Sequence, residues 1–314
     1  MEVLTSVTPE QLLSLKNDAE NGDLDAQLNL AMLYYNGDAV KQDINETLHW
    51  FGLAANQGSQ DAQLFVGWIY DNGVGVQADK TEAFRWYQMA AEAGHPNAQL
   101  MLGIFYNNGE GVTQNKEKAR HWLLMAAEQG HPDAQLHLGW IYDNADGVEK
   151  DQKQALRWYQ MAADQGNPRA QYILGISYEL GDGLEQDKKE ALRWYRLAAE
   201  QGFPEAQYKL GLAYDDGEGL EVNKQEAIKW YLLAAEQGNS HAQYSLAIMH
   251  YIGDGIKKNH KDAYFWFILA HEFGNPKASQ YKATFDMVTG NFRKARVYAK
   301  VRKWLEEKGF QAKI

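Results

Sequence analysis

The stretch AQYILGISYELGDGLEQDKKEALRWYRLAAEQG, residues 170–202, decides the fold because its landmarks recur along the chain at one fixed spacing. The Ala-Gln pair that opens it occurs seven times, each time 36 residues after the last. A glycine and a tryptophan recur with the same step. Three ladders that share one period indicate an array of stacked repeats rather than separate globular domains. The tryptophans of the ladder, which we expect to be structural, are Trp50, Trp86, Trp122, Trp158, Trp194, Trp230 and Trp266.

Each repeat is predicted to form two helices, an A helix followed by a B helix. In the second repeat we place the A helix at about Gln60 to Asn72 and the B helix at about Lys80 to Ala93. An Asp or Asn precedes every predicted B helix, and an acid or amide stands three residues later in six of the seven repeats, which predicts a capping box. The periodic glycine then ends the B helix. Prolines that fit the first position of an A helix are Pro96, Pro132, Pro168 and Pro204.

Other glycines have positions that indicate turns and close packing. Gly73 and Gly75 could begin a phosphate-binding loop, but they recur in other repeats and no Gly-Lys-Ser/Thr follows. We therefore interpret them as the turn between the A and B helices. Gly67 recurs within the A helices and costs about 1 kcal/mol there relative to alanine, so we expect it to admit a neighbouring helix.

Composition limits the possible partners and compartments. The chain has 314 residues, 45% of them hydrophobic, no cysteine and a net charge of −11. Residues 291–314 carry +6, which leaves −17 for the rest and argues against nucleic acid or an anionic membrane as the main partner. No apolar stretch approaches the length that spans a bilayer, and the start lacks a signal peptide. We expect a cytoplasmic protein, or a periplasmic one if a signal peptide has been removed.

The pattern A-x-x-x-L-G-x-x-Y-x-x-G-x-G-V, followed by D-x-x-x-A-x-x-W-Y-x-x-A-A-E-x-G, resembles the bacterial Sel1-like repeat, a relative of the tetratricopeptide repeat. The resemblance implies an all-α, right-handed α/α superhelix (solenoid) whose A helices line a concave groove. It also implies an adaptor role in protein complexes. We predict a capping helix in residues 1–22, seven repeats in residues 23–274, and a degenerate repeat with a basic capping helix in residues 275–314.

Carry-over from the tetratricopeptide pattern predicts which A-helix side chains face the groove. They are apolar or aromatic at the centre and mostly acidic at the margins, which suits a partner protein with apolar anchors and basic residues. For the position of Trp68 and Trp140, and for that of Leu64, Tyr172, Tyr208 and Tyr244, ordinary core between helices stays an open alternative. The predicted partner-binding residues are Asp61, Leu64, Trp68, Asp71, Asn107, Trp140, Asp143, Tyr172, Glu179, Tyr208, Asp215, Tyr244 and Tyr251.

We predict no catalytic residue, no metal site and no cofactor. The histidines show no His-Glu-x-x-His pattern, and no Ser-His-Asp set has suitable spacing. The leading hypothesis is a non-catalytic scaffold that binds a partner protein. A dedicated inhibitor, such as an immunity protein that neutralises a bacterial toxin, is the main alternative. A hydrolase, proposed for cysteine-rich relatives, is disfavoured because this chain has no cysteine. The sequence leaves the oligomeric state open.

Overall fold

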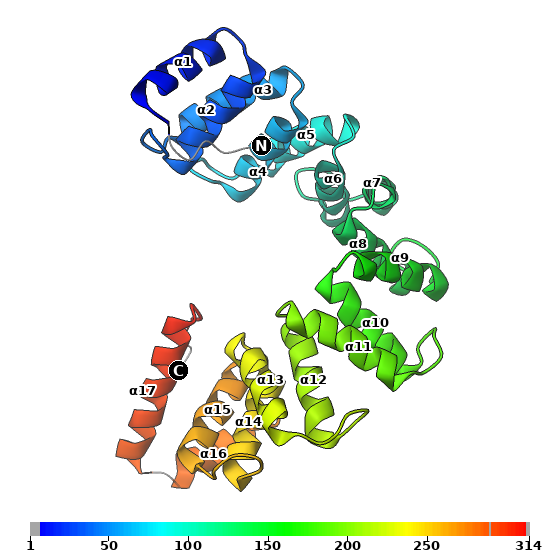
Figure 1. Cartoon of the computed structure of the whole chain (residues 1–314), viewed down its shortest axis with the longest axis vertical. Coiled ribbons are helices and arrows are strands. Elements are labelled where there is room, and N and C mark those ends of the chain that lie inside the picture. Colours follow the sequence, from blue (N-terminus) through cyan, green and yellow to red (C-terminus); the bar gives the residue numbers. More distant parts are fainter. Residues whose placement is uncertain (1–6, 289, 312–314) are drawn as a thin grey trace. The chain divides into compact units, whose positions relative to one another are not determined.

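The computed structural model describes residues 7–288 and 290–311, and these residues form α-helices and no β-strand. They group into two units, Met1–Trp158 (unit 1) and Tyr159–Ile314 (unit 2), with the boundary inside α9. Figure 1 shows the helices along the chain. Their bounds are α1 (Pro9–Glu20), α2 (Leu24–Asn36), α3 (Ile44–Asn56), α4 (Gln60–Asn72), α5 (Lys80–Glu92), α6 (Pro96–Asn108), α7 (Lys116–Glu128), α8 (Pro132–Asp143), α9 (Gln152–Asp164), α10 (Pro168–Leu180), α11 (Lys188–Glu200), α12 (Pro204–Asp216), α13 (Lys224–Glu236), α14 (Ser240–Ile252), α15 (His260–Glu272), α16 (Ala278–Val288) and α17 (Asn291–Glu307).

The even-numbered helices from α2 to α14 are the A helices, and the odd-numbered helices from α3 to α15 are the B helices. From α1 to α8, and again from α10 to α16, each helix packs against the next. The predicted division of the chain leaves α1, α16 and α17 outside the seven pairs, and it stays a proposal. Parts of the two predicted terminal segments, residues 1–6, 289 and 312–314, lie outside the described residues.

The helix starts show the predicted caps, with one correction. The side chain of Asp79 accepts the backbone N–H of Glu82 at 3.0 Å, as expected. In a capping box the side chain of Glu82 would accept the backbone N–H of Asp79. This N–H donates instead to the carbonyl of Tyr70, at 2.9 Å. The hairpin brings the end of the A helix within reach, so the same bond forms in every repeat and ties the two helices together. A complete capping box is formed by Thr8 and Gln11 at the start of α1.

The loops between A and B helices need two residues with positive φ. Gly73 and Gly75 have φ angles of 65° and 67°, which confirms their role in the turn. Ala39 and Ala145 occupy equivalent positions in other repeats, with φ angles of 58° and 55°. An L-residue in this region costs roughly 1–2 kcal/mol, so these two loops are strained relative to the others.

The A-helix glycines allow close packing of an aromatic ring. A Cβ placed on Gly67 would lie 2.7 Å from Cδ1 of Tyr87, and one on Gly175 would lie 2.4 Å from Cε1 of Tyr195. Both rings are almost completely buried. The packing role predicted for these glycines is therefore confirmed. Alanine occupies the equivalent position in the first and last repeats, where phenylalanine replaces the tyrosine.

The repeated glutamine is a buried polar link between neighbouring repeats. Gln99 donates to the carbonyl of Ala91 at 3.2 Å and accepts from Gln129 at 2.7 Å. The first of these bonds recurs in all seven repeats, where the same Nε2 donates to a carbonyl eight residues earlier. Buried amides need such partners, so the Ala-Gln ladder reports hydrogen bonding as well as packing.

The tryptophan ladder lies at the edge of the core. Trp50, Trp158, Trp194 and Trp266 are buried, with 4–8% of their surface exposed, and the other three are half-buried. The residue that follows each tryptophan lies deeper and exposes at most 3%. The centre of each repeat is therefore built on this second position, and the structural role of the tryptophans stays a prediction for substitution experiments.

Candidate protein-binding surface

Unit 1 contains a surface groove lined by apolar side chains of the A helices. Its volume is about 700 Å³. Three rings contact one another along it: the centroids of Tyr35 and Phe65 are 5.1 Å apart, those of Phe65 and Trp68 5.5 Å, and those of Tyr35 and Trp68 6.2 Å. Trp68 exposes 37% of its surface. We call this the unit 1 groove, lined by Tyr35, Asp61, Leu64, Phe65, Trp68, Tyr87, Asn97, Leu100, Met101, His131 and Asp133.

Polar side chains of successive repeats form the rim of the unit 1 groove. Nε2 of His131 lies 2.7 Å from Oδ1 of Asn97, and Nδ1 of His131 accepts the N–H of Ala134 at 3.4 Å. Burial lowers the pKa of His131, which favours the neutral ring that this pair of bonds requires. One repeat earlier, His95 lies 3.2 Å from the exposed carboxylate of Asp61.

Some of the predicted acidic residues are held by ion pairs within the chain. Lys80, the first residue of α5, donates to Asp71 and also lies 3.1 Å from Glu110 in the next repeat. Lys224, the first residue of α13, is paired with Asp215 in the same way, with its Nζ 2.6 Å from Oδ1 of Asp215. The hydroxyls of the buried tyrosines in α5 and α13 donate to these same two carboxylates.

Three further predicted margin residues are also engaged within the chain. Glu179 accepts from Tyr195 and, at 2.8 Å, from Lys209. Asn107 accepts from the lysine at the start of α7, and Asp143 is paired loosely with Lys150 at 3.6 Å.

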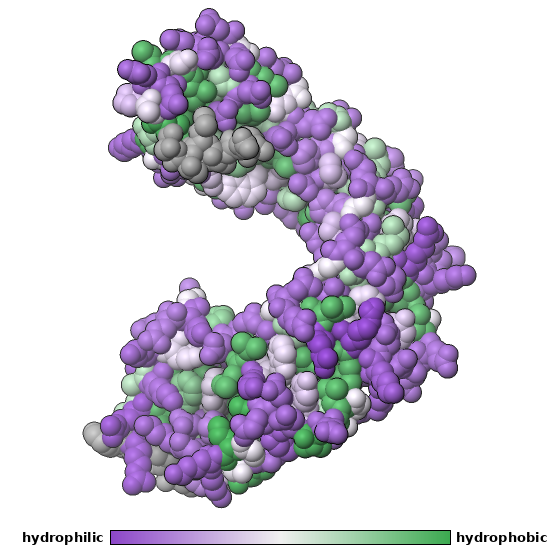
Figure 2. Space-filling model, viewed as in Figure 1, coloured by the Kyte–Doolittle hydropathy of each residue, from purple (hydrophilic) through white to green (hydrophobic). Residues whose placement is uncertain are grey.

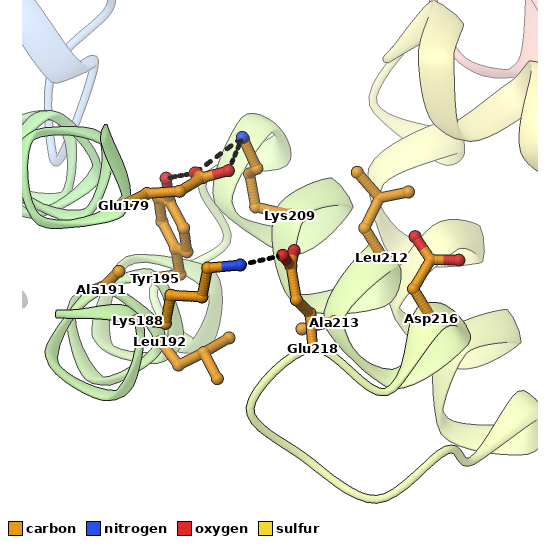
Figure 3. A pocket seen from close by; sticks show the side chains of 10 residues that line it. All are labelled: Glu179, Lys188, Ala191, Leu192, Tyr195, Lys209, Leu212, Ala213, Asp216 and Glu218. Carbon is orange, nitrogen blue, oxygen red and sulfur yellow. Dashed lines mark hydrogen bonds and ion pairs between the residues drawn. The ribbon is translucent and has the colours of Figure 1, made fainter. Parts of the chain in front are cut away.

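Figure 3 shows the surroundings of Glu179 in unit 2. Its carboxylate faces the Tyr195 hydroxyl and the Lys209 ammonium, while Lys188 reaches Glu218 in the next loop. Burial opposes ionisation, but the hydrogen bonds from Lys209 and Tyr195 hold the pKa of Glu179 below its ordinary value. The cavity among these residues measures about 80 Å³, far below the size of a ligand pocket. Its charges therefore link repeats rather than form a ligand site.

The predicted tyrosines of unit 2 lie half-buried among other rings. The ring centroids of Tyr172 and Tyr195 are 5.8 Å apart, as are those of Tyr208 and Tyr231. Tyr244 and Tyr251 both contact Tyr281 of α16. Trp140 exposes 46% of its surface but does not line the unit 1 groove. The structure thus brings together Asp61, Leu64 and Trp68 from the predicted set, and it does not bring the remaining members to the same place.

Sequence reasoning missed Phe65 and Met101, which line the same groove. The signal was present, because residues 61, 64, 65 and 68 follow the i, i+3, i+4, i+7 spacing of one helix face. Figure 2 shows that the visible surface is largely hydrophilic, with hydrophobic residues gathered in small patches. Within the described residues, no group of three or more His, Cys, Asp or Glu side chains could hold a metal ion. None of the helices described, in residues 7–288 and 290–311, is long and apolar enough to cross a membrane.

Comparison with known proteins identifies the repeat. The Sel1 repeat profile matches seven consecutive segments, 24–59, 60–95, 96–131, 132–167, 168–203, 204–239 and 240–271. The chain belongs to the Sel1 repeat family. This confirms the predicted all-α superhelix of 36-residue repeats. Sel1 repeat proteins generally mediate protein–protein interactions, and such scaffolds are typically non-catalytic. No curated protein sequence matches the chain significantly.

Several solved structures are similar to this Sel1 repeat chain. A Sel1 repeat protein from Oxalobacter formigenes is 38% identical, with a TM-score of 0.74 over 88% of this chain and 80% of that one. A protective antigen present in uropathogenic Escherichia coli strains is 31% identical, with a TM-score of 0.55 over 95% of this chain and 71% of that one. An immunity protein from Pseudomonas aeruginosa is 23% identical, with a TM-score of 0.45 over 69% of this chain and 83% of that one, which is too distant to bear on function.

Proposed function

We propose that this Sel1 repeat chain is a non-catalytic scaffold that binds a partner protein in the unit 1 groove. The observation that carries the proposal is Trp68. It exposes 37% of its surface inside an apolar groove, at a position where five of the seven repeats have a smaller aliphatic residue or methionine. Exposed apolar patches with an aromatic residue at the centre are characteristic of protein interaction sites.

The rim of the unit 1 groove indicates the chemistry of the partner. Asp61 exposes 67% of its side chain, and Asp133 lies at the same rim. Asp71, Glu179 and Asp215 contact lysines of this chain, and none of the three lines the unit 1 groove. We therefore expect the partner to insert an apolar anchor beside Trp68 and to place a lysine or arginine at the rim acids.

Affinity capture followed by direct measurement tests this function. The wild-type chain is used to capture a partner, and that partner is purified for calorimetry against the wild-type chain and the Trp68→Ala variant. An aromatic anchor at the centre of an interface contributes about 2 kcal/mol or more, so we expect Trp68→Ala to weaken binding roughly 30-fold. Met89→Ala is the matched control, because Met89 exposes 42% of its surface on a B helix of the same unit.

The result depends on both variants staying folded, which thermal melting establishes. If the purified partner binds the Trp68→Ala variant as tightly as the wild type, the groove is not its binding site. Trp140→Ala then tells whether the contact extends along α8, where Trp140 exposes 46% of its surface.

A further inference from the structure

The B helix α13 carries an exposed apolar pair that binding in the unit 1 groove does not explain. Leu232 and Leu233 of α13 expose 36% and 47% of their surface. The corresponding residues one repeat later, Ile268 and Leu269 of α15, are completely buried. At these two positions the repeats differ in whether the apolar pair is covered. The element that covers Ile268 and Leu269 therefore shows what could cover Leu232 and Leu233.

The helix that covers this pair on α15, and does not cover it on α13, is α17. Among the described helices, α15 packs closely on α17 in addition to α14 and α16. Figure 1 shows α17 running alongside α15. Val301 and Leu305 of α17 are buried in the same core as Leu269. The rings of Trp304 and Trp266 have centroids 6.4 Å apart.

Ion pairs hold α17 in place on either side of this apolar contact. Lys300 lies 3.0 Å from Asp262 of α15, and Lys308 lies 3.0 Å from Glu236 of α13. Residues 293–310 contain seven Lys or Arg and two Glu, so α17 is a basic helix. Its apolar face consists of Val297, Val301 and Leu305, at a spacing of four residues.

Residues of the same kind as those that contact α17 occur one repeat earlier in the chain. Thirty-six residues before Asp262 and Glu236 the chain again has acids, Glu226 and Glu200. Thirty-six residues before Ile268 and Leu269 it has Leu232 and Leu233. All four residues lie on the neighbouring B helices α11 and α13 of the same unit. We call this set the α13 site, and it consists of Glu200, Glu226, Leu232 and Leu233.

We propose that the α13 site binds a basic amphipathic helix of a partner protein, in the way that α15 binds α17. A helix with apolar residues four apart would cover the two leucines, and one of its flanking lysines or arginines would meet Glu200. A second would have to compete with Lys229, which lies 2.5 Å from Glu226. The excess negative charge of residues 1–290 favours a basic occupant over an acidic one. Two aromatic contacts are missing, because Lys229 and Gln237 stand where α15 has Phe265 and Phe273. Binding should therefore be weaker than the packing of α17.

A peptide with the sequence of residues 293–310 is the probe. It is labelled with a fluorophore and titrated with the full-length chain while anisotropy is measured. We expect saturable binding that weakens with added salt and that falls at least tenfold in the Leu232→Glu, Leu233→Glu double variant. Leu180→Glu is the matched control, since Leu180 exposes 68% of its surface on an A helix of the same unit. A peptide with Val301→Asp and Leu305→Asp should not bind.

Three results would overturn the proposal. The first is no binding of the wild-type peptide. The second is binding that the double variant leaves unchanged, which would mean that the peptide only displaces α17 from α15. The third is self-association of the chain that the double variant abolishes in sedimentation experiments, which would make the occupant the α17 of a second copy. The outcome is independent of the unit 1 groove, because Trp68→Ala should leave the affinity for the peptide unchanged.

Discussion

Gln63 marks a place where a single substitution should add stability. Gln99, its counterpart one repeat later, accepts a hydrogen bond from Gln129 at 2.7 Å. The corresponding donor for Gln63 would come from residue 93, which is alanine, and Oε1 of Gln63 is buried without a partner. We predict that Ala93→Gln raises the free energy of unfolding by supplying the missing donor.

The magnitude follows from the hydrogen bonds that Gln129 makes. Its amide donates to Gln99 and to the carbonyl of Gly94, at 2.7 and 3.1 Å. Each neutral hydrogen bond stabilises by about 0.5–1.5 kcal/mol net, and fixing a glutamine side chain costs up to roughly 1.5–2 kcal/mol. We therefore expect a gain of about 1 kcal/mol for Ala93→Gln. The reverse change, Gln129→Ala, leaves Oε1 of Gln99 without its donor and should cost about 1–2 kcal/mol.

Urea unfolding followed by circular dichroism measures both changes. The midpoint should rise for Ala93→Gln and fall for Gln129→Ala, with unchanged slopes. The control is Ala93→Gln in a Gln63→Ala background, where the gain should disappear because the acceptor has been removed. If the gain persists in that background, or if Ala93→Gln is neutral on its own, the buried acceptor does not limit stability and the reasoning is wrong.

Three further predictions concern stability. Trp194→Ala should cost about 3–5 kcal/mol in urea unfolding, because the ring exposes only 4% of its surface, whereas Trp68→Ala should cost far less. Ala145→Gly should stabilise by roughly 0.5–1 kcal/mol, since it removes left-handed strain that exceeds the entropy glycine adds to the unfolded chain. Glu179→Gln should destabilise at pH 7. Because the pKa of Glu179 is lowered on folding, this difference should shrink as the pH falls below about 4.5; a difference that stays constant to pH 3 would contradict the assigned ion pair with Lys209.

The sequence was sufficient to predict the backbone of the repeats. The expected A helix from Gln60 to Asn72 has the bounds of α4, and the expected B helix ends one residue early, with Ala93 as its C-cap. These boundaries are predictable because caps, prolines and glycines act within a few residues of the chain. The terminal segment, residues 275–314, was predicted only as a degenerate repeat and a basic capping helix, and there α16 begins at Ala278, where the repeat pattern has decayed.

The side-chain partners were harder to predict because they join residues that no local rule connects. Asp71 was assigned to a binding margin, but the lysine that holds it comes nine residues later, across the hairpin. The amide of Asp79 was expected to bond within its own helix, and it bonds instead to the preceding A helix. The amide contact recurs in all seven repeats, and the lysine contact recurs between Asp215 and Lys224. Aligning the repeats by their period would have shown the lysine nine residues after these two acids.

Residues that recur in every repeat are the wrong place to look for a binding site in such a chain. The Gln ladder and the A-helix glycines are each explained by a contact with the same or the adjacent repeat, and those contacts need no partner. A binding residue should instead exceed what its position requires for packing. Trp68 meets this criterion because aliphatic residues or methionine suffice at its position in five other repeats. Leu233 is chosen for another reason: Leu or Met occupies its position in every repeat, but the next repeat buries its counterpart, Leu269, under α17. The A-helix surface therefore follows from an unusual residue at its position, and the B-helix surface follows from a difference in burial between two consecutive repeats.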